Sequence, residues 1–187
     1  YNHRVQKRST SGAWSVIVNN GRPDGFVRYP NGIGVDARYS NFFVSDYDPV
    51  TGVSRVQKFA NTGAFAGVVG SSSAAGALSQ PRGITMGMET NLFVADTGNR
   101  QVQVCGSTGK WSVVLSSMFL MEPHDVVLDM FGNIYVSDTT SNRILRLNNQ
   151  MLSGLTAPYL YGQFSSGHVA AWILTTNAAY KSAAQVT

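Results

Sequence analysis

The stretch PHDVVLDMFGNIYVSD, residues 123–138, contains two short apolar segments separated by a turn at Gly132 and Asn133. Such segments, bounded by Gly and Asn, are typical of paired β-strands. Two other parts of the chain repeat the pattern: YPNGIGVD with NFFVSD at 29–36 and 41–46, and QPRGITMG with NLFVAD at 80–87 and 91–96. A unit that recurs three times predicts a repeat fold.

Each copy continues into two more expected strands. The third strand follows an arginine, at residues 54–58, 99–103 and 142–146, and a fourth apolar strand follows at 65–69 and 111–115. Units of about 40 to 50 residues with four strands are typical of propeller blades, which bury their faces by stacking side by side. We therefore predict an all-β protein, a β-propeller of four-stranded blades.

The ends of the chain fit this pattern only in part. Residues 2–7 resemble a third strand and residues 13–18 a fourth, which predicts a partial blade over 1–29, followed by blades starting near 30, 81 and 123. We expect the last fourth strand within 157–167, so that the blades occupy 1–167. Residues 168–187 are left as a degenerate strand, a packing tail or a non-native end. Three to four blades predict an incomplete or open ring, since closed rings commonly take about 4 to 8.

Composition bears on the charge of the partners, on membrane insertion and on the cellular compartment. The 14 basic and 10 acidic residues give a formal charge of +4, a mild bias toward anionic partners. No apolar run reaches the roughly 18 residues of a membrane-spanning helix, so no membrane span is expected. The single Cys105 cannot form an internal disulfide. The low charge density and the many small polar residues favour an extracellular or secreted protein.

The repeated pattern, Pro-x-Gly, then Asn-x-(Phe/Tyr)-Val-x-Asp, then Asn-Arg before alternating residues, resembles the NHL repeat. The resemblance covers roughly residues 1–149 and implies a β-propeller. It does not specify a function, because the family includes extracellular sensor domains, RNA-binding propellers and a peptide-amidating lyase.

Residues present in every copy are expected to be structural. Asp46, Asp96 and Asp138 end the second strand, where a carboxylate can accept backbone N–H bonds from the turn that follows. Arg55, Arg100 and Arg143 begin the next strand and could pair with these aspartates. Catalysis would need only one or two special copies.

The residue after the repeat proline differs between copies, which indicates that the fold does not dictate it. It is Asn31, Arg82 or His124, and by analogy with propellers we expect it at the mouth of the central channel. The turn after the second strand also varies, being longest at 47–52. We predict that Asn31, Arg82 and His124 bind a ligand.

His124 raises the question of a metal. The resemblance to the amidating lyase implies a zinc-binding histidine after the proline, and zinc needs three or four converging ligands. The matching positions here are Asn31 and Arg82, and His3 and His168 fall outside the corresponding slot. We therefore predict no metal site, no cofactor and no catalytic residue, with His124 the one candidate ligand.

The predicted function is a non-catalytic binding module whose loops contact a protein, peptide or carbohydrate. One alternative is a metal-dependent propeller lyase. Another is RNA binding, but the basic residues of the first part of the chain are not interleaved with exposed aromatics, so nucleic acid is an unexpected partner. Open blade edges could also support self-association.

Overall fold

The computed structural model describes residues 2–36, 38–73, 76–87 and 90–148, together with the backbone of 172–174. These residues form three four-stranded antiparallel sheets and one two-stranded sheet, confirming the all-β propeller architecture. This part of the chain contains no α-helix, and its 3-10 turns include η2 (Thr97–Asn99). None of its elements is a helix long and apolar enough to cross a membrane.

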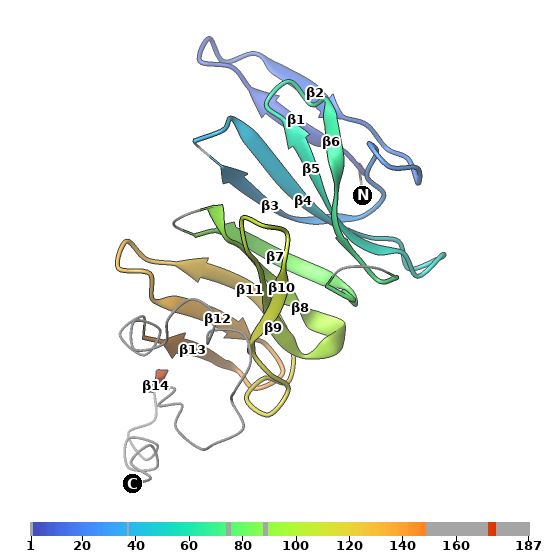
Figure 1. Cartoon of the computed structure of the whole chain (residues 1–187). Coiled ribbons are helices and arrows are strands. Elements are labelled where there is room, and N and C mark those ends of the chain that lie inside the picture. Colours follow the sequence, from blue (N-terminus) through green and yellow to red (C-terminus); the bar gives the residue numbers. More distant parts are fainter. Residues whose placement is uncertain (1, 37, 74–75, 88–89, 149–171, 175–187) are drawn as a thin grey trace, which may run out of the picture.

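The sheets follow one another in chain order, and within each the strands pair with their sequence neighbours (Figure 1). The partial blade has β1 (Val5–Arg8) and β2 (Trp14–Val18). Blade 1 has β3 (Pro30–Asp36), β4 (Asn41–Tyr47), β5 (Ser54–Ala60) and β6 (Phe65–Ser71). Blade 2 has β7 (Pro81–Met86), β8 (Leu92–Asp96), β9 (Gln101–Cys105) and β10 (Trp111–Leu115). Blade 3 has β11 (Pro123–Leu128), β12 (Ile134–Asp138), β13 (Arg143–Leu147) and β14 (Trp172–Leu174).

The fourth strand of blade 3 is β14, which pairs with β13. It lies within 168–187, the region that had no repeat signature. The expected fourth strand at 157–167 lies outside the described residues, and the domain boundary at 167 stays a prediction.

The core lies between the sheets, one apolar cluster for each pair of neighbouring blades. Successive strand residues point to opposite faces, so Phe42 and Val44 face the partial blade while Phe43 faces blade 2. All five residues of β8 are likewise buried. Strands covered on both faces carry continuous rather than alternating apolar runs, as NFFV and NLFVA do.

The first strands β3, β7 and β11 are the strands through which neighbouring blades approach most closely, with β7 between the other two. A β-carbon at Gly32 would collide with the carbonyl oxygen of Arg82 on the next blade, so this approach requires glycine.

The repeated aspartates hold the chain before the first strand rather than the turn after the second, which corrects the sequence-based expectation. Asp46 Oδ1 accepts the backbone N–H groups of Arg28 and Tyr29 at 2.8 and 2.7 Å. The reason is register: Asp46 lies opposite Pro30, which has no N–H for the ladder, so the chain entering there needs another acceptor.

The same arrangement recurs in the other blades. Asp138 Oδ1 accepts the N–H groups of Met121 and Glu122, and Asp96 Oδ1 accepts the N–H of Ser79. All three aspartates are at most 2% exposed. A buried carboxylate needs such partners, so these residues fix where each first strand begins.

Blades 1 and 3 contain the expected arginine–aspartate pair, and blade 2 does not. Arg55 donates from Nε and Nη2 to Asp46 Oδ2, and Arg143 donates from Nε to Asp138 Oδ2. Arg100 was expected to pair with Asp96, and this was wrong. It is exposed, has φ 57°, and its guanidinium contacts the sulfur of Met121.

The discrepancy is a shift of one residue. Gln101, not Arg100, lies opposite Asp96 in the strand register, because the η2 turn places Arg100 in a left-handed conformation before β9 begins. Three neutral amides, from Asn99, Gln101 and Gln103, donate to Asp96 Oδ2 in place of an arginine.

Candidate functional site

Three β-bulges position the candidate binding residues. In β3 the register shifts between Pro30 and Gly32, and in β11 between Pro123 and Asp125, which leaves Asn31 and His124 outside the regular pairing. In β7 the shift lies between Pro81 and Ile84 and includes Arg82. A bulge redirects a side chain relative to the sheet and is common beside functional sites.

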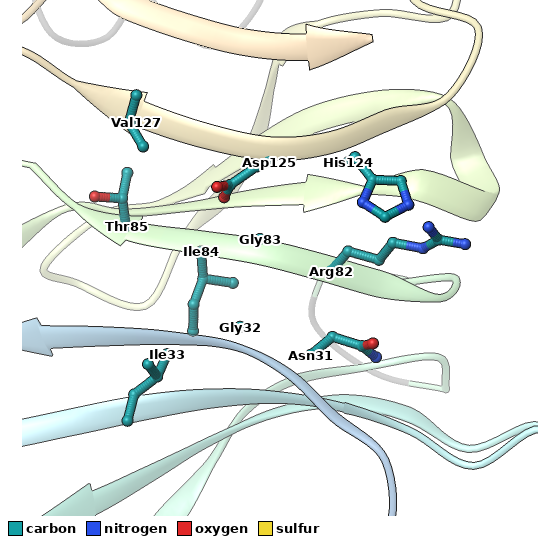
Figure 2. Close-up of a pocket in the computed structure, with 10 residues that line it drawn as sticks. All are labelled: Asn31, Gly32, Ile33, Arg82, Gly83, Ile84, Thr85, His124, Asp125 and Val127. Atoms are coloured by element: carbon teal, nitrogen blue, oxygen red, sulfur yellow. The ribbon is translucent and has the colours of Figure 1, made fainter. Parts of the chain in front are cut away.

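The redirected side chains line one groove of about 490 Å³ along the first strands. Figure 2 shows Asn31, Arg82 and His124 side by side, one from each blade, with Ile33, Ile84 and Val127 farther along the strands. The groove thus has a polar end and an apolar floor. Its lining is Asn31, Gly32, Ile33, Arg82, Gly83, Ile84, Thr85, His124, Asp125 and Val127.

Arg82 lies at the centre of this polar end. Its Nη2 is 3.7 Å from Glu122 Oε1, and the two side chains are 32% and 38% exposed. That distance exceeds hydrogen-bonding range, and a pair this exposed contributes little. Glu122 is held more firmly by the Thr140 hydroxyl, which donates to Oε2 at 2.5 Å and is the main cause of its lowered pKa.

The neighbours of Arg82 offer further polar atoms. Asn31 Nδ2 donates to the carbonyl of Tyr29 at 3.0 Å, which fixes the amide at the groove edge. Asp125 Oδ1 accepts the N–H of Val126. The polar end therefore combines a cation, an imidazole and an amide, and the Asp125 carboxylate lies farther along the groove, between His124 and Thr85.

A second concavity of about 380 Å³ adjoins the groove and shares Asn31 and Arg82 with it. Its other lining residues are Tyr29, Tyr47, Pro49 and Gln80. We call it the rim pocket. Tyr47 and Pro49 lie in the long turn at 47–52, which the sequence pattern had indicated as variable. Tyr29 and Gln80 were not predicted, because their positions precede the repeat prolines and carry no signal of their own.

The loop that carries Pro49 is held by Asp48, which is only 3% exposed. Its Oδ2 accepts from Arg22 Nε at 2.8 Å and its Oδ1 from the N–H of Val50 at 3.0 Å. Burial would raise the pKa of Asp48, but these hydrogen bonds and that of Thr51 outweigh it and hold the pKa at about 2. The carboxylate is therefore ionised at neutral pH and joins the loop backbone at Val50 to the Arg22 side chain.

The histidines do not converge. His124 lies in the groove, His3 packs edge-on against the ring of Tyr29, and His168 lies outside the described residues. Within the described ranges no three His, Cys, Asp or Glu side chains are grouped so as to hold a metal ion.

The carboxylates near His124 in the sequence serve local structure. Asp138 anchors the entry to β11, as above. Asp129 accepts from the side chain and N–H of Asn133, from the N–H of Phe131 and from the hydroxyl of Tyr135, which together lower its pKa. His124 is thus not part of an acid–base group with Asp129 or Asp138.

Comparison with solved structures places the chain among propeller-type proteins. A chain in a crystal structure of a nidogen/laminin complex has a TM-score of 0.65 at 17% identity, covering 80% of this chain and 53% of that one. A streptogramin B lyase has a TM-score of 0.59 at 17% identity, covering 80% and 46%. Virginiamycin B lyase from Staphylococcus aureus has a TM-score of 0.58 at 12% identity, covering 79% and 46%.

These identities establish the fold alone. The chain spans about half the length of the structures it resembles. No protein-family model and no curated protein matches the sequence. The class is therefore a propeller of four-stranded blades, and the neighbours include both a protein from a binding complex and lyases.

Proposed function

We propose that this protein is a non-catalytic binding module, an extracellular propeller scaffold of NHL-type repeats that binds a protein, peptide or carbohydrate through Asn31, Arg82 and His124. The observation that carries the proposal is the bulge repeated in three first strands. It directs three chemically different side chains into one groove while the surrounding framework stays the same.

The division between framework and groove supports this proposal. The framework residues are buried and bonded to one another, as Asp46 and Arg55 are. Asn31, Arg82 and His124 are each at least partly exposed, and the Arg82 side chain forms only a long ion pair within the described part of the chain. Polar groups with few internal partners, above an apolar floor, are what a binding site offers to a ligand.

The nidogen/laminin structure shows that a propeller-type fold occurs in a protein–protein complex, which supports the binding role and the extracellular setting.

Self-association is a further prediction: within the described residues β1 pairs only with β2, and Trp14 and Val16 on β2 are 65% and 42% exposed. An unpaired strand edge is a template for another chain. Mass measured across a concentration series tests it.

The experiment uses a panel of small probes, namely acetate, inorganic phosphate, N-acetylated amino acids and monosaccharides. Their effects are followed residue by residue in ¹H–¹⁵N correlation spectra. We expect the shifts to gather around Asn31, Arg82 and His124 and to disappear in the triple alanine variant, whose melting temperature should stay near that of the wild type. Shifts scattered over the surface, or unchanged in the triple variant, contradict the proposal.

The lyase neighbours favour an enzyme as the second candidate. For this chain the relevant metal candidate is His124, and its ligand partners would have to come from residues beyond those described here. Elemental analysis of the purified protein, beside His124→Ala, distinguishes the candidates. Stoichiometric metal that the substitution removes would replace the binding proposal with the enzyme.

A further inference from the structure

The groove and the rim pocket adjoin each other, because both are lined by Asn31 and Arg82, and we call the two together the two-part site. Groups bound in the two parts would therefore lie on either side of the Arg82 side chain. An extended peptide advances about 3.3 to 3.5 Å per residue. Side chains one to three positions apart in such a peptide can occupy both parts at once.

The positive charge of Arg82 indicates that the centre of the two-part site binds an anionic group. The Arg82 guanidinium has five donors and matches a carboxylate with two parallel hydrogen bonds. Its contact with Glu122, at 3.7 Å and partly exposed, is weak enough for a ligand carboxylate to replace. Glu122 keeps the hydrogen bond from Thr140 when it gives up this contact.

The rim pocket has different chemistry. Two tyrosines and a proline contribute to its walls, and the loop of Pro49 is held by the buried Asp48. Aromatic and proline walls with a preset shape suit an apolar side chain or a proline of an extended peptide, since little ordering is needed on binding.

Resting on the proposed function, we propose that the two-part site takes an extended peptide with a carboxylate at Arg82 and an apolar or proline anchor between Tyr29, Tyr47 and Pro49. The carboxylate comes from an acidic side chain or from the C-terminus of the peptide. A saccharide, which would also use the polar groups of the groove, is the competing ligand.

The test is affinity selection of a synthetic library of acetylated seven-residue peptides, made once with a free carboxyl terminus and once amidated. Enriched peptides are expected to carry a carboxylate within three positions of an aromatic, aliphatic or proline residue. Enrichment only in the free-carboxyl set identifies the C-terminus as the source, and enrichment in both sets identifies Asp or Glu.

Affinities of one enriched peptide are then measured for variants that keep the fold. Arg82→Ala is expected to weaken binding about tenfold or more, the loss of hydrogen bonds to a charged group. Arg82→Lys should restore part of the affinity, and Pro49→Ala should weaken binding. Arg38→Ala, an exposed arginine at the opposite end of β3, is the matched control and should bind like the wild type.

The outcomes separate the two proposals. Equal affinity for Arg82→Ala and the wild type, or enriched peptides without a carboxylate, overturns the peptide inference. Binding to a saccharide array that is lost in Arg82→Ala overturns it as well but leaves the groove as a binding site. If neither peptides nor saccharides bind in a way that the triple variant of Asn31, Arg82 and His124 abolishes, the proposed function fails too.

Discussion

Replacing Arg55 with alanine should destabilise the protein far more than the same change at Arg100, although both arginines occupy similar places in the repeated sequence. Arg55 is 4% exposed and donates to Asp46, to Asp24 Oδ1 at 2.8 Å and to the carbonyl of Phe26 at 3.0 Å. Its removal leaves Asp46, 2% exposed, without its cation.

Breaking a buried pair by removing one partner costs about 3–5 kcal/mol. For a chain of this size, that corresponds to a fall in melting temperature of roughly 10 °C. Arg100 is exposed, and the one hydrogen bond of its guanidinium to the described residues goes to the sulfur of Met121. Arg100→Ala should therefore change the free energy of unfolding by no more than about 0.5 kcal/mol.

Urea unfolding followed by tryptophan fluorescence and circular dichroism gives both values. A double-mutant cycle with Asp46→Asn isolates the pair from the other contacts of Arg55. Equal effects of Arg55→Ala and Arg100→Ala, or a loss below about 1 kcal/mol for Arg55→Ala, would refute the inference that the buried Arg55–Asp46 ion pair stabilises its blade.

Two further predictions concern the loop and the first strands. Because the pKa of Asp48 is about 2 in the folded protein against 3.8 when unperturbed, its contribution to stability is complete above about pH 4 and is lost as the pH falls toward 2. Urea midpoints across that range should fall, and should fall less in Arg22→Ala. An identical profile in the variant would argue against a stabilising hydrogen bond between Arg22 and Asp48. Gly32→Ala should cost about 1–3 kcal/mol through its clash with the Arg82 carbonyl, whereas Gly34→Ala, which meets neighbours only at 3.6 Å or more, should cost little, and equal melting temperatures would contradict the close approach of the blades.

The propeller architecture was predictable from sequence because short-range patterns determine it. The runs that end in Asp46, Asp96 and Asp138 became second strands, of which those in blades 1 and 2 are buried on both faces. Each proline before them became the start of a first strand. Strands also form at Val5–Arg8 and Trp14–Val18, overlapping the expected 2–7 and 13–18. These features depend on alternation and turn residues, which are local.

What the sequence did not reveal depends on contacts between distant segments. Nothing local to Asp46 indicates that its carboxylate accepts from Arg28 and Tyr29, because that pairing is set by strand register. The η2 turn moved Arg100 out of register, and its three-residue length is not evident from the letters alone. The rim pocket required the same long-range information, since Tyr29, Tyr47 and Gln80 meet only in the folded chain.

The placement of Asn31, Arg82 and His124 at equivalent positions followed from the repeat. The bulges of the first strands bring these three side chains into one groove, and the sequence does not reveal those bulges. Ligand binding by the three residues is our proposal. Membership of the NHL repeat family is part of the same proposal, because the similar solved structures establish the propeller fold and not the repeat family.

The most direct test of the central claim is a crystal structure of the protein with an enriched ligand from the peptide or saccharide selection. The account predicts density for the ligand in the groove, within hydrogen-bonding distance of Arg82 and beside Asn31 and His124. Ligand bound elsewhere, with these three side chains contacting only solvent, would contradict it.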